Sequence, residues 1–175
     1  GIAVEELARI GVTHAIRIGS CGALQKEIRL GDLILVQGAV RDEGTSRTYI
    51  DSIYPAIPDF ELMNACVEAA EEEQIPAHVG MARSHDSFYT DREDEIDALW
   101  VGRGVLGCDM ETAALFVIGR LRGVKTASIL NTVVEYEDNL EDNINNYTDG
   151  VNATVQGEKN EIHVALEALY RCSGK

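Results

Sequence analysis

The sequence predicts an α/β fold in which a central, mixed or mainly parallel β-sheet is flanked by helices. Stretches of strand length alternate along the chain with stretches of helical periodicity, which is the pattern of a sheet with helices packed on it. The predicted strands are apolar on both faces, as expected where helices cover both sides of a sheet. With 175 residues, 45% of them hydrophobic, the chain is long enough for one domain with its own core.

Five short apolar stretches, several of them rich in β-branched residues, are predicted as strands. They cover residues 13–18, 32–40, 77–82, 105–110 and 125–134. The first strand is expected to end in a tight turn at residues 19–22, Gly-Ser-Cys-Gly, because glycine and serine favour turns. The last stretch is apolar almost throughout, which indicates a buried strand.

Five stretches with apolar residues at helical spacing are predicted as helices. They cover residues 2–10, 59–74, 91–100, 110–122 and 151–172. In the second stretch, Leu62 and Cys66 belong to an apolar face that recurs every three to four residues. Residues 41–58 hold turn formers and aromatics and are expected to form a loop that borders a site. The acidic residues 135–142 are expected to be solvated.

Charge and composition exclude some classes of function. Acidic residues outnumber basic ones 30 to 15, for a net charge of -15, so the chain lacks the basic clusters that bind nucleic acid. No apolar run approaches the roughly 20 residues of a membrane span, so no membrane partner is expected. The four cysteines form no C-x-x-C pair, which favours reduced thiols and a cytoplasmic protein. The four histidines have no ligand spacing, so no metal site is predicted.

Residues 17–24 read Arg-Ile-Gly-Ser-Cys-Gly-Ala-Leu and are the most informative segment of the chain. The Arg17 guanidinium, the Ser20 hydroxyl and the backbone N–H groups of small residues can together bind an anion. Ligands of α/β proteins lie at the carboxyl ends of strands, so a position directly after a strand favours a site. The alternative is a tight turn with a surface arginine. The segment lacks the third glycine of a dinucleotide-binding fingerprint.

Two further segments hold side chains suited to a sugar and a base. Asp109-Met110-Glu111 lies where a predicted strand meets a predicted helix. A carboxylate there either accepts hydrogen bonds from paired sugar hydroxyls or simply stabilises the first turn of the helix. Neighbours at i and i+2 do not share a helix face, so Asp109 and Glu111 are expected to point in different directions. Phe88 and Tyr89 can stack on a flat base or belong to the core.

Taken together, these segments resemble the nucleoside phosphorylase-I family, and most closely its uridine phosphorylase branch. The matching segments follow the order and spacing of the family along nearly the whole chain up to about residue 134. They are residues 2–7, 17–25, 31–33, 86–89 and 109–113. The resemblance implies a three-layer α/β fold with a central mixed sheet between helices. It also implies a single phosphorylase-like domain over residues 1–175 that lacks the N-terminal segment of the family.

The resemblance implies a reaction as well. Family members cleave the N-glycosidic bond of a nucleoside with inorganic phosphate, which gives ribose 1-phosphate and the free base. We therefore expect a pentosyltransferase that takes phosphate as co-substrate and uses no cofactor. A homo-oligomer, either a dimer or a hexamer built of dimers, is expected because family sites borrow groups across a dimer interface.

The family motifs also assign roles to residues at the phosphate end of the site. The resemblance implies that Arg17 and Ser20 bind phosphate. It implies that Cys21 and Gly22 line the nucleoside pocket through their backbone. Arg17, together with Glu111, is expected to carry catalysis by fixing the reactants and stabilising separated charge.

At the nucleoside end, the resemblance implies that Glu111 holds the ribose 2′- and 3′-hydroxyls while Met110 packs on the sugar. Asp109 occupies a position where relatives carry an acid, and Phe88 sits where an aromatic residue contacts base or sugar. Arg92 is expected to donate to a carbonyl of the base, although uridine enzymes carry a glutamine at this position.

Departures from the family patterns keep several functions open. Arg92 and Asp94 replace the glutamine and arginine that read uracil, and Val134 replaces the general-acid aspartate of the purine branch. The alternatives are a purine nucleoside phosphorylase, a nucleosidase that uses water, and a non-catalytic nucleoside-binding protein. Hydrolytic relatives tend to lack the arginine before the Ile-Gly-Ser segment, so Arg17 favours phosphorolysis.

Overall fold

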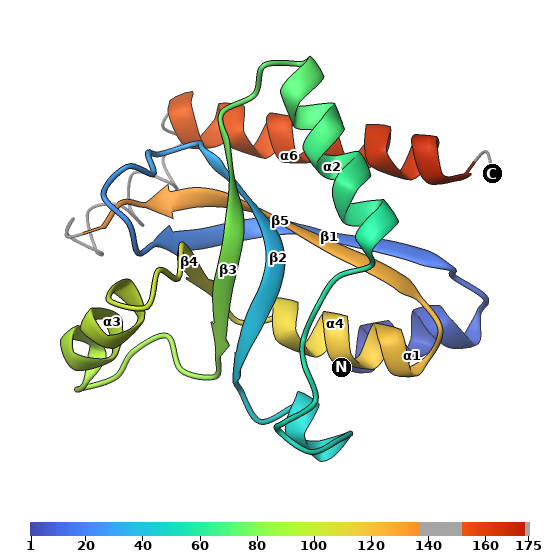
Figure 1. Ribbon diagram of the computed structural model, residues 1–175, viewed down its shortest axis with the longest axis horizontal. Helices are drawn as coiled ribbons and strands as arrows, with labels where there is room; N and C mark the ends of the chain where they lie inside the picture. The colour runs from blue at the N-terminus through green and yellow to red at the C-terminus, as the bar shows by residue number, and fades with distance from the viewer. Residues whose placement is uncertain (137–151, 174–175) are drawn as a thin grey trace.

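A computed structural model describes residues 1–136 and 152–173 of the chain. It has three layers, with the sheet in the middle and helices on both sides (Figure 1). The strands are β1 (His14–Ala23), β2 (Leu33–Asp42), β3 (Ala77–His85), β4 (Gly107–Asp109) and β5 (Lys125–Val134). The helices are α1 (Ile2–Arg9), α2 (Phe60–Glu72), α3 (Glu93–Val101), α4 (Thr112–Leu121) and α6 (Asn152–Ser173), with a 3-10 helix η1 at Ser46–Thr48. The predicted α/β class with flanking helices is confirmed.

The sheet is mixed and closes on itself in the order β1-β4-β3-β2-β5. β1 runs parallel to β5, and β3 runs parallel to both β2 and β4. The two antiparallel contacts, β1 with β4 and β2 with β5, join these parallel groups. The closure brings the end of β1 beside β4, so segments far apart in sequence meet at one end of the closed sheet.

Two hydrophobic clusters hold the layers together. On one side of the sheet, α2 and α6 pack with Cys66, Ala69 and Val164 against strand residues. On the other side, α4 packs with Phe116, which is 1% exposed, and α1 lies beside it (Figure 1). Both faces of the sheet are therefore covered, which explains why the strands are apolar on both faces.

The predicted turn at residues 19–22 is wrong. β1 continues through all four residues because β5 runs alongside and supplies backbone partners, pairing Gly19 with Leu130. The small residues have another role here, since they leave space above one face of the strand. A register shift between Cys21 and Gly22 is the only irregularity in the pairing of β1 with β5 over the described residues.

Other boundaries differ modestly from the predictions. β4 holds three residues instead of the predicted six, because only residues 107–109 pair with the neighbouring strands β1 and β3. The predicted loop at residues 41–58 begins with the last residues of β2 and contains η1. Residues 137–142 of the predicted acidic stretch lie outside the described residues. No helix in the described ranges is long and apolar enough to span a membrane.

Candidate active site

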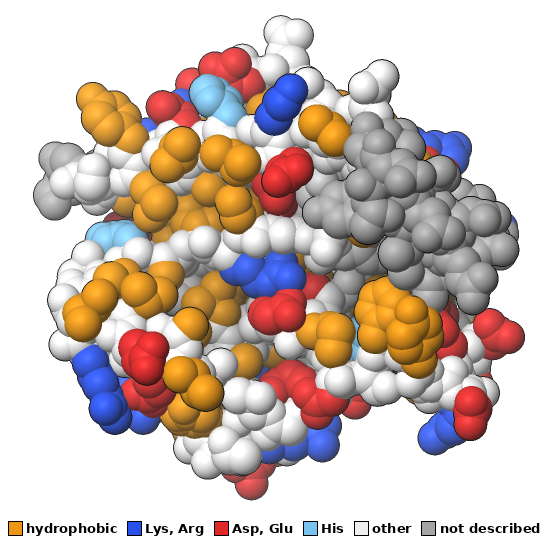
Figure 2. Space-filling model, turned by 180° about the vertical axis from the view of Figure 1, so that it is seen from behind, with side chains coloured by type: hydrophobic (Ala, Val, Ile, Leu, Met, Phe, Trp, Pro, Cys, Tyr) orange, Lys and Arg blue, Asp and Glu red, His pale blue; other side chains and the backbone are white. Residues whose placement is uncertain are grey.

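One cavity of about 800 Å³ opens where β1, β4, β5 and the segment from β3 to α3 come together. Figure 2 shows a face of the molecule on which basic and acidic side chains meet in a central hollow between hydrophobic side chains. The cavity is lined by residues from the three segments that the sequence analysis singled out: the segment that begins at Arg17, the Asp-Met-Glu segment and the Phe-Tyr pair. They are Arg17, Ser20, Cys21, Gly22, Phe88, Tyr89, Asp109, Met110 and Glu111.

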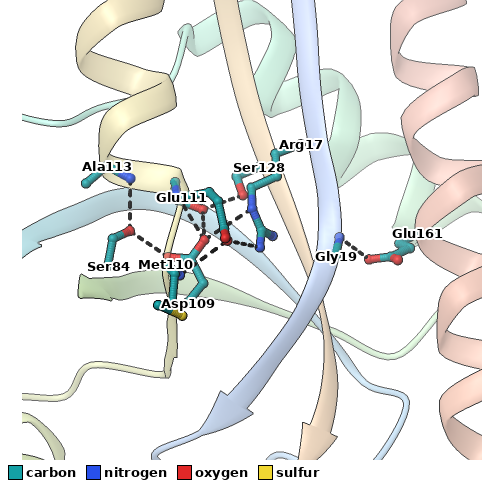
Figure 3. Close-up of polar contacts among 10 residues, drawn as sticks. Arg17, Gly19, Ser84, Asp109, Met110, Glu111, Ala113, Ser128 and Glu161 are labelled. Carbon is teal, nitrogen blue, oxygen red and sulfur yellow. Dashed lines mark hydrogen bonds and ion pairs between the residues drawn. The ribbon is translucent and has the colours of Figure 1, made fainter. Parts of the chain in front are cut away.

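Arg17 lies at the centre of the polar contacts (Figure 3). Its Nη2 donates to Glu111 Oε2 at 2.5 Å, and its Nε lies 3.4 Å from Asp109 Oδ2. Its Nη1 is buried and has no hydrogen-bond partner among the described residues. A buried guanidinium nitrogen without a partner is costly unless a ligand completes it. Arg17 therefore lines the cavity with a nitrogen whose N–H groups the described residues leave unused.

Gly19 makes room for the Arg17 guanidinium. A Cβ atom at Gly19 would lie only 3.0 Å from Nη1 and 3.2 Å from Nη2 of Arg17. Residues at i and i+2 of a strand share a face, so the guanidinium lies over the backbone of Gly19. The glycine that suggested a turn thus allows the close approach of a side chain, which a Cβ atom would crowd.

Asp109 is buried beneath the cavity and has a full set of partners. Its Oδ1 accepts from Ser84 Oγ at 2.5 Å, and its Oδ2 accepts from the Thr112 backbone N–H at 2.9 Å and from the Thr112 hydroxyl at 2.5 Å. Ser84 Oγ in turn accepts from the Ala113 N–H at 2.9 Å (Figure 3). These bonds tie the start of α4 to β3 and β4, so Asp109 holds Arg17 in place from below.

Glu111 has a different environment two residues later. Its side chain is 60% exposed, whereas that of Asp109 is fully buried. The carboxylate faces the cavity at the start of α4, next to Met110, and is open to the hydroxyls of a ligand. The two carboxylates have different surroundings, but both contact Arg17, because the helix begins only after Glu111.

Ser20 and Phe88 also lie where the sequence places them. Ser20 is exposed and lines the cavity near Arg17. Phe88 stacks edge-to-face on Tyr89 with ring centroids 5.0 Å apart, and both rings line the cavity. An exposed aromatic pair beside a polar cluster offers a flat surface for a base.

Arg92 is the exception among the expected site residues, because it does not line the cavity. Its guanidinium forms two hydrogen bonds with Glu95, at 3.0 and 2.9 Å. α3 begins at Glu93, so Arg92 and Glu95 form an i, i+3 pair near the solvent-exposed start of the helix. The structure therefore does not place Arg92 in the cavity, and its expected contact with the base stays a prediction.

Sequence reasoning missed a group of charged residues at the α3 end of the cavity. Arg83 is buried and pairs with Asp42 at 2.8 Å. Glu93 and Asp97 both line the cavity, and burial raises the pKa of both carboxyls. Their i, i+4 spacing within a predicted helix was a signal that both point to one side.

Glu161 was also missed, and nothing in the sequence near it indicates a site. It lies on α6, is 4% exposed, and accepts from the Gly19 backbone N–H at 2.9 Å (Figure 3). Burial raises the pKa of Glu161 to about 7, while the Gly19 N–H and the Arg17 guanidinium oppose that rise. A carboxyl with this pKa is partly ionised at neutral pH.

The cysteines are free thiols, and burial makes three of them poor nucleophiles. Burial raises the pKa of Cys66 and Cys108 to about 12 and raises that of Cys21 as well. These groups therefore remain protonated at neutral pH. Within residues 1–136 and 152–173, no three His, Cys, Asp or Glu side chains are placed to hold a metal ion.

Comparisons with known proteins identify the family. The model of the phosphorylase superfamily matches residues 2–169. The guanosine phosphorylase of Halorubrum lacusprofundi is 40% identical over 128 residues, which are 73% of this chain and 53% of that protein. The uridine phosphorylase of Treponema pallidum is 33% identical over 181 residues, covering 96% of this chain and 66% of that protein. The chain thus spans between half and two thirds of the length of these relatives.

A solved structure agrees with this assignment. The crystal structure of uridine phosphorylase from Vibrio fischeri ES114 superposes with a TM-score of 0.89 at 49% sequence identity, over 97% of this chain and 69% of that one. The resemblance seen in the motifs is therefore confirmed. The chain belongs to the nucleoside phosphorylases of the phosphorylase superfamily, with a likeness to uridine phosphorylases that extends over nearly its whole length.

Proposed function

We propose that this chain carries the phosphate and ribose subsites of a nucleoside phosphorylase of the uridine phosphorylase type. The observation that supports this most directly is the pairing of two groups in one cavity. A guanidinium with a buried, unpartnered nitrogen, on Arg17, lies beside the exposed carboxylate of Glu111. The first suits an oxyanion, and the second suits a pair of hydroxyls.

In the proposed reaction, a phosphate oxygen attacks the anomeric carbon while the base leaves. The C–N bond breaks, its electron pair goes to the base, a C–O bond forms, and the proton of the phosphate is transferred to the base. The protein supplies no covalent nucleophile. Its residues bring two reactants together and stabilise separated charge, with Arg17 and Ser20 on the phosphate and Glu111 on the ribose.

The ion pair between Arg17 and Glu111 has a part in this scheme. In the structure, Glu111 accepts a hydrogen bond from Arg17 Nη2. When ribose hydroxyls donate to Glu111 and phosphate accepts from Arg17, each charged group exchanges one partner for another. The exchange keeps both charges hydrogen-bonded, which limits the cost of separating them.

Glu111→Ala is the direct mutational test of the ribose subsite. Removing a charged hydrogen bond that stabilises the transition state should lower kcat/KM by about 10²–10³-fold. The side chain is 60% exposed, so the variant should fold normally, which circular dichroism can verify. Near-normal turnover would remove Glu111 from its proposed role.

A substrate panel tests the reaction itself. Uridine, thymidine, inosine, guanosine and adenosine are incubated with the protein at several phosphate concentrations, and free base and ribose 1-phosphate are measured. We expect base release to require phosphate and to match ribose 1-phosphate mole for mole. Base release that is independent of phosphate would instead indicate a nucleosidase, and binding without turnover would indicate a nucleoside-binding protein.

A purine nucleoside is the second candidate substrate. Two carboxyl side chains, Glu93 and Asp97, line the α3 end of the cavity, whereas Arg92 pairs with Glu95 and does not line it. Carboxyl groups accept hydrogen bonds from N–H groups, of which guanine offers several on one edge. Guanosine phosphorylase is among the relatives. In the panel, a preference for guanosine or inosine over uridine would favour this candidate.

Assembly and location are further proposals that rest on family membership. We propose a cytoplasmic homo-oligomer that takes a nucleoside and phosphate as substrates and uses no cofactor. Exposed apolar side chains on α6 support self-association, because large apolar groups in contact with water favour burial at an interface. They are Ile162, Leu166 and Tyr170.

A further inference from the structure

We propose that Glu161 on α6 is a positioning residue for phosphate binding, which acts by fixing the backbone beneath Arg17. This inference rests on the proposed function, because it assigns a role within the same phosphate subsite. Glu161 does not line the cavity. Its effect on a ligand would pass through Gly19, whose N–H it binds at 2.9 Å.

Glu161 satisfies a backbone group on an edge of β1. β5 pairs with one edge of β1 along most of its length. On the other edge, β4 is the strand that pairs with β1, and within the described residues it does so only at Gly22 and Ala23. The Gly19 N–H is left without a strand partner there, and an N–H that is partly shielded from water is stabilised by an acceptor. The Glu161 carboxylate supplies it from α6 (Figure 3).

Gly19 in turn lies directly against the Arg17 side chain. The guanidinium lies against the Gly19 backbone, where a Cβ atom would lie 3.0 to 3.3 Å from its atoms and crowd it. A shift of this backbone would therefore move the surface on which the guanidinium rests. The Glu161 carboxylate also lies close enough to Arg17 for the two charges to attract. Both effects hold the guanidinium against the backbone of Gly19.

The helix that carries Glu161, α6, is packed tightly against the sheet. Gly157 lies one turn earlier on α6, and a Cβ atom there would collide with the side chain of Asn131 on β5 and lie 2.8 Å from the Gly31 Cα. Asn131 Nδ2 donates to the Thr154 carbonyl at 2.9 Å. α6 is thus fixed directly against the sheet, so the position of the carboxylate is fixed as well.

Three substitutions separate positioning from a general structural role. Glu161→Ala removes the acceptor, Glu161→Asp moves it back by one methylene, and Glu161→Gln keeps a carbonyl acceptor without the charge. Glu158→Gln is the control for local charge, because it removes an exposed carboxylate one turn earlier on the same helix, whose charge acts on Glu161, and leaves the Glu161 acceptor in place. Steady-state kinetics at varied phosphate and varied nucleoside are measured for each variant, together with calorimetric binding of inorganic phosphate.

We expect Glu161→Ala and Glu161→Asp to raise the phosphate KM and the phosphate Kd about ten-fold, as for the loss of one charged hydrogen bond. The nucleoside KM should change less than two-fold. Glu161→Gln should restore most of the phosphate affinity, and Glu158→Gln should leave it unchanged. If Glu161→Ala does not fold, Glu161→Asp gives the same comparison.

The proposal is overturned if folded Ala and Asp variants keep the phosphate KM and Kd of the wild type, or if both KM values and kcat change together. Failure of the proposed function has a different signature. In that case the wild-type protein releases no base in the presence of phosphate. The calorimetric Kd still reports whether Glu161 governs phosphate binding, since that measurement does not depend on turnover.

Discussion

At the scale of single residues, one guanidinium organises the site by using its donors in different ways. Asp109 is buried and saturated with hydrogen bonds, so it serves as a fixed support for Arg17. Glu111 is exposed and can exchange partners. The sequence indicated Arg17 and Glu111 through family motifs but not their ion pair, because these residues lie 94 positions apart. Spacing along a chain reveals helix neighbours, not contacts made by tertiary structure.

Arg17→Lys tests whether the fork of donors matters or only the charge. Lysine keeps the charge but cannot contact Asp109, Glu111 and phosphate in the same fixed geometry. We expect the phosphate KM to rise about ten-fold or more, and Arg17→Ala to raise it further, with a much smaller change in the nucleoside KM. Arg92→Ala is the control, since Arg92 pairs with Glu95 outside the cavity. A raised nucleoside KM in that control would restore Arg92 to the base subsite.

The raised pKa of Glu161 predicts a pH-dependent contribution to stability. Burial raises this pKa from the ordinary 4.5 to about 7, so the folded state binds the proton more tightly than the unfolded state. The contribution to stability is therefore fully present below pH 4.5 and is lost as the pH rises through 7. Urea unfolding at pH 5 and pH 8 should show that wild type loses stability relative to Glu161→Gln over this range. Parallel pH dependence in the two proteins would mean that Glu161 titrates normally.

At the scale of secondary-structure elements, β1 shows where local reasoning fails. The Gly-Ser-Cys-Gly run has the composition of a turn, yet it is strand because β5 pairs with it in parallel. Tertiary pairing overrides local preference when backbone groups find partners on a neighbouring strand. In contrast, β5 was predicted to the residue, because its long apolar run matches its burial between two layers. The length and apolar character of an element are visible in sequence, but the identity of its neighbours is not.

Gly157→Ala tests the close packing of α6 on the sheet. In an exposed helix, alanine is more favourable than glycine by about 1 kcal/mol. Here the new methyl group would collide with Asn131, so we expect a loss of about 1–3 kcal/mol in the free energy of unfolding. Lys159→Ala, at an exposed position of the same helix, is the control and should change stability little. A more stable Gly157→Ala variant would show that α6 can move away from β5.

At the scale of the whole molecule, the cavity exists only because the closed sheet unites segments that are distant in sequence. Its walls come from β1, β4, β5 and the segment before α3. The alternation of strands and helices was enough to predict the layers, and the family motifs selected residues that the structure brings together in one cavity. The spacing of Glu93 and Asp97 indicated a shared helix face but not that this face lines the cavity. The support from α6 was not predictable, because it depends on how α6 packs against β1. Binding in this cavity should therefore stabilise the whole domain.

Phosphate should stabilise the protein beyond any effect of ionic strength. The net charge of -15 means that salt alone reduces self-repulsion and raises stability. A specific site adds a second term, about 2.7 kcal/mol at a phosphate concentration of 100 times Kd. For a domain of this size, that corresponds to a rise of roughly 5–10 °C in Tm.

The measurement compares thermal unfolding in sodium phosphate and in sodium chloride at equal ionic strength, for wild type and Arg17→Ala. The wild type should gain more from phosphate than from chloride, whereas Arg17→Ala should respond equally to both, because screening needs no particular side chain and the buried donor of Arg17 is lost. An equal response of the wild type to the two salts would reduce the effect of phosphate to screening and leave the cavity without an anion site.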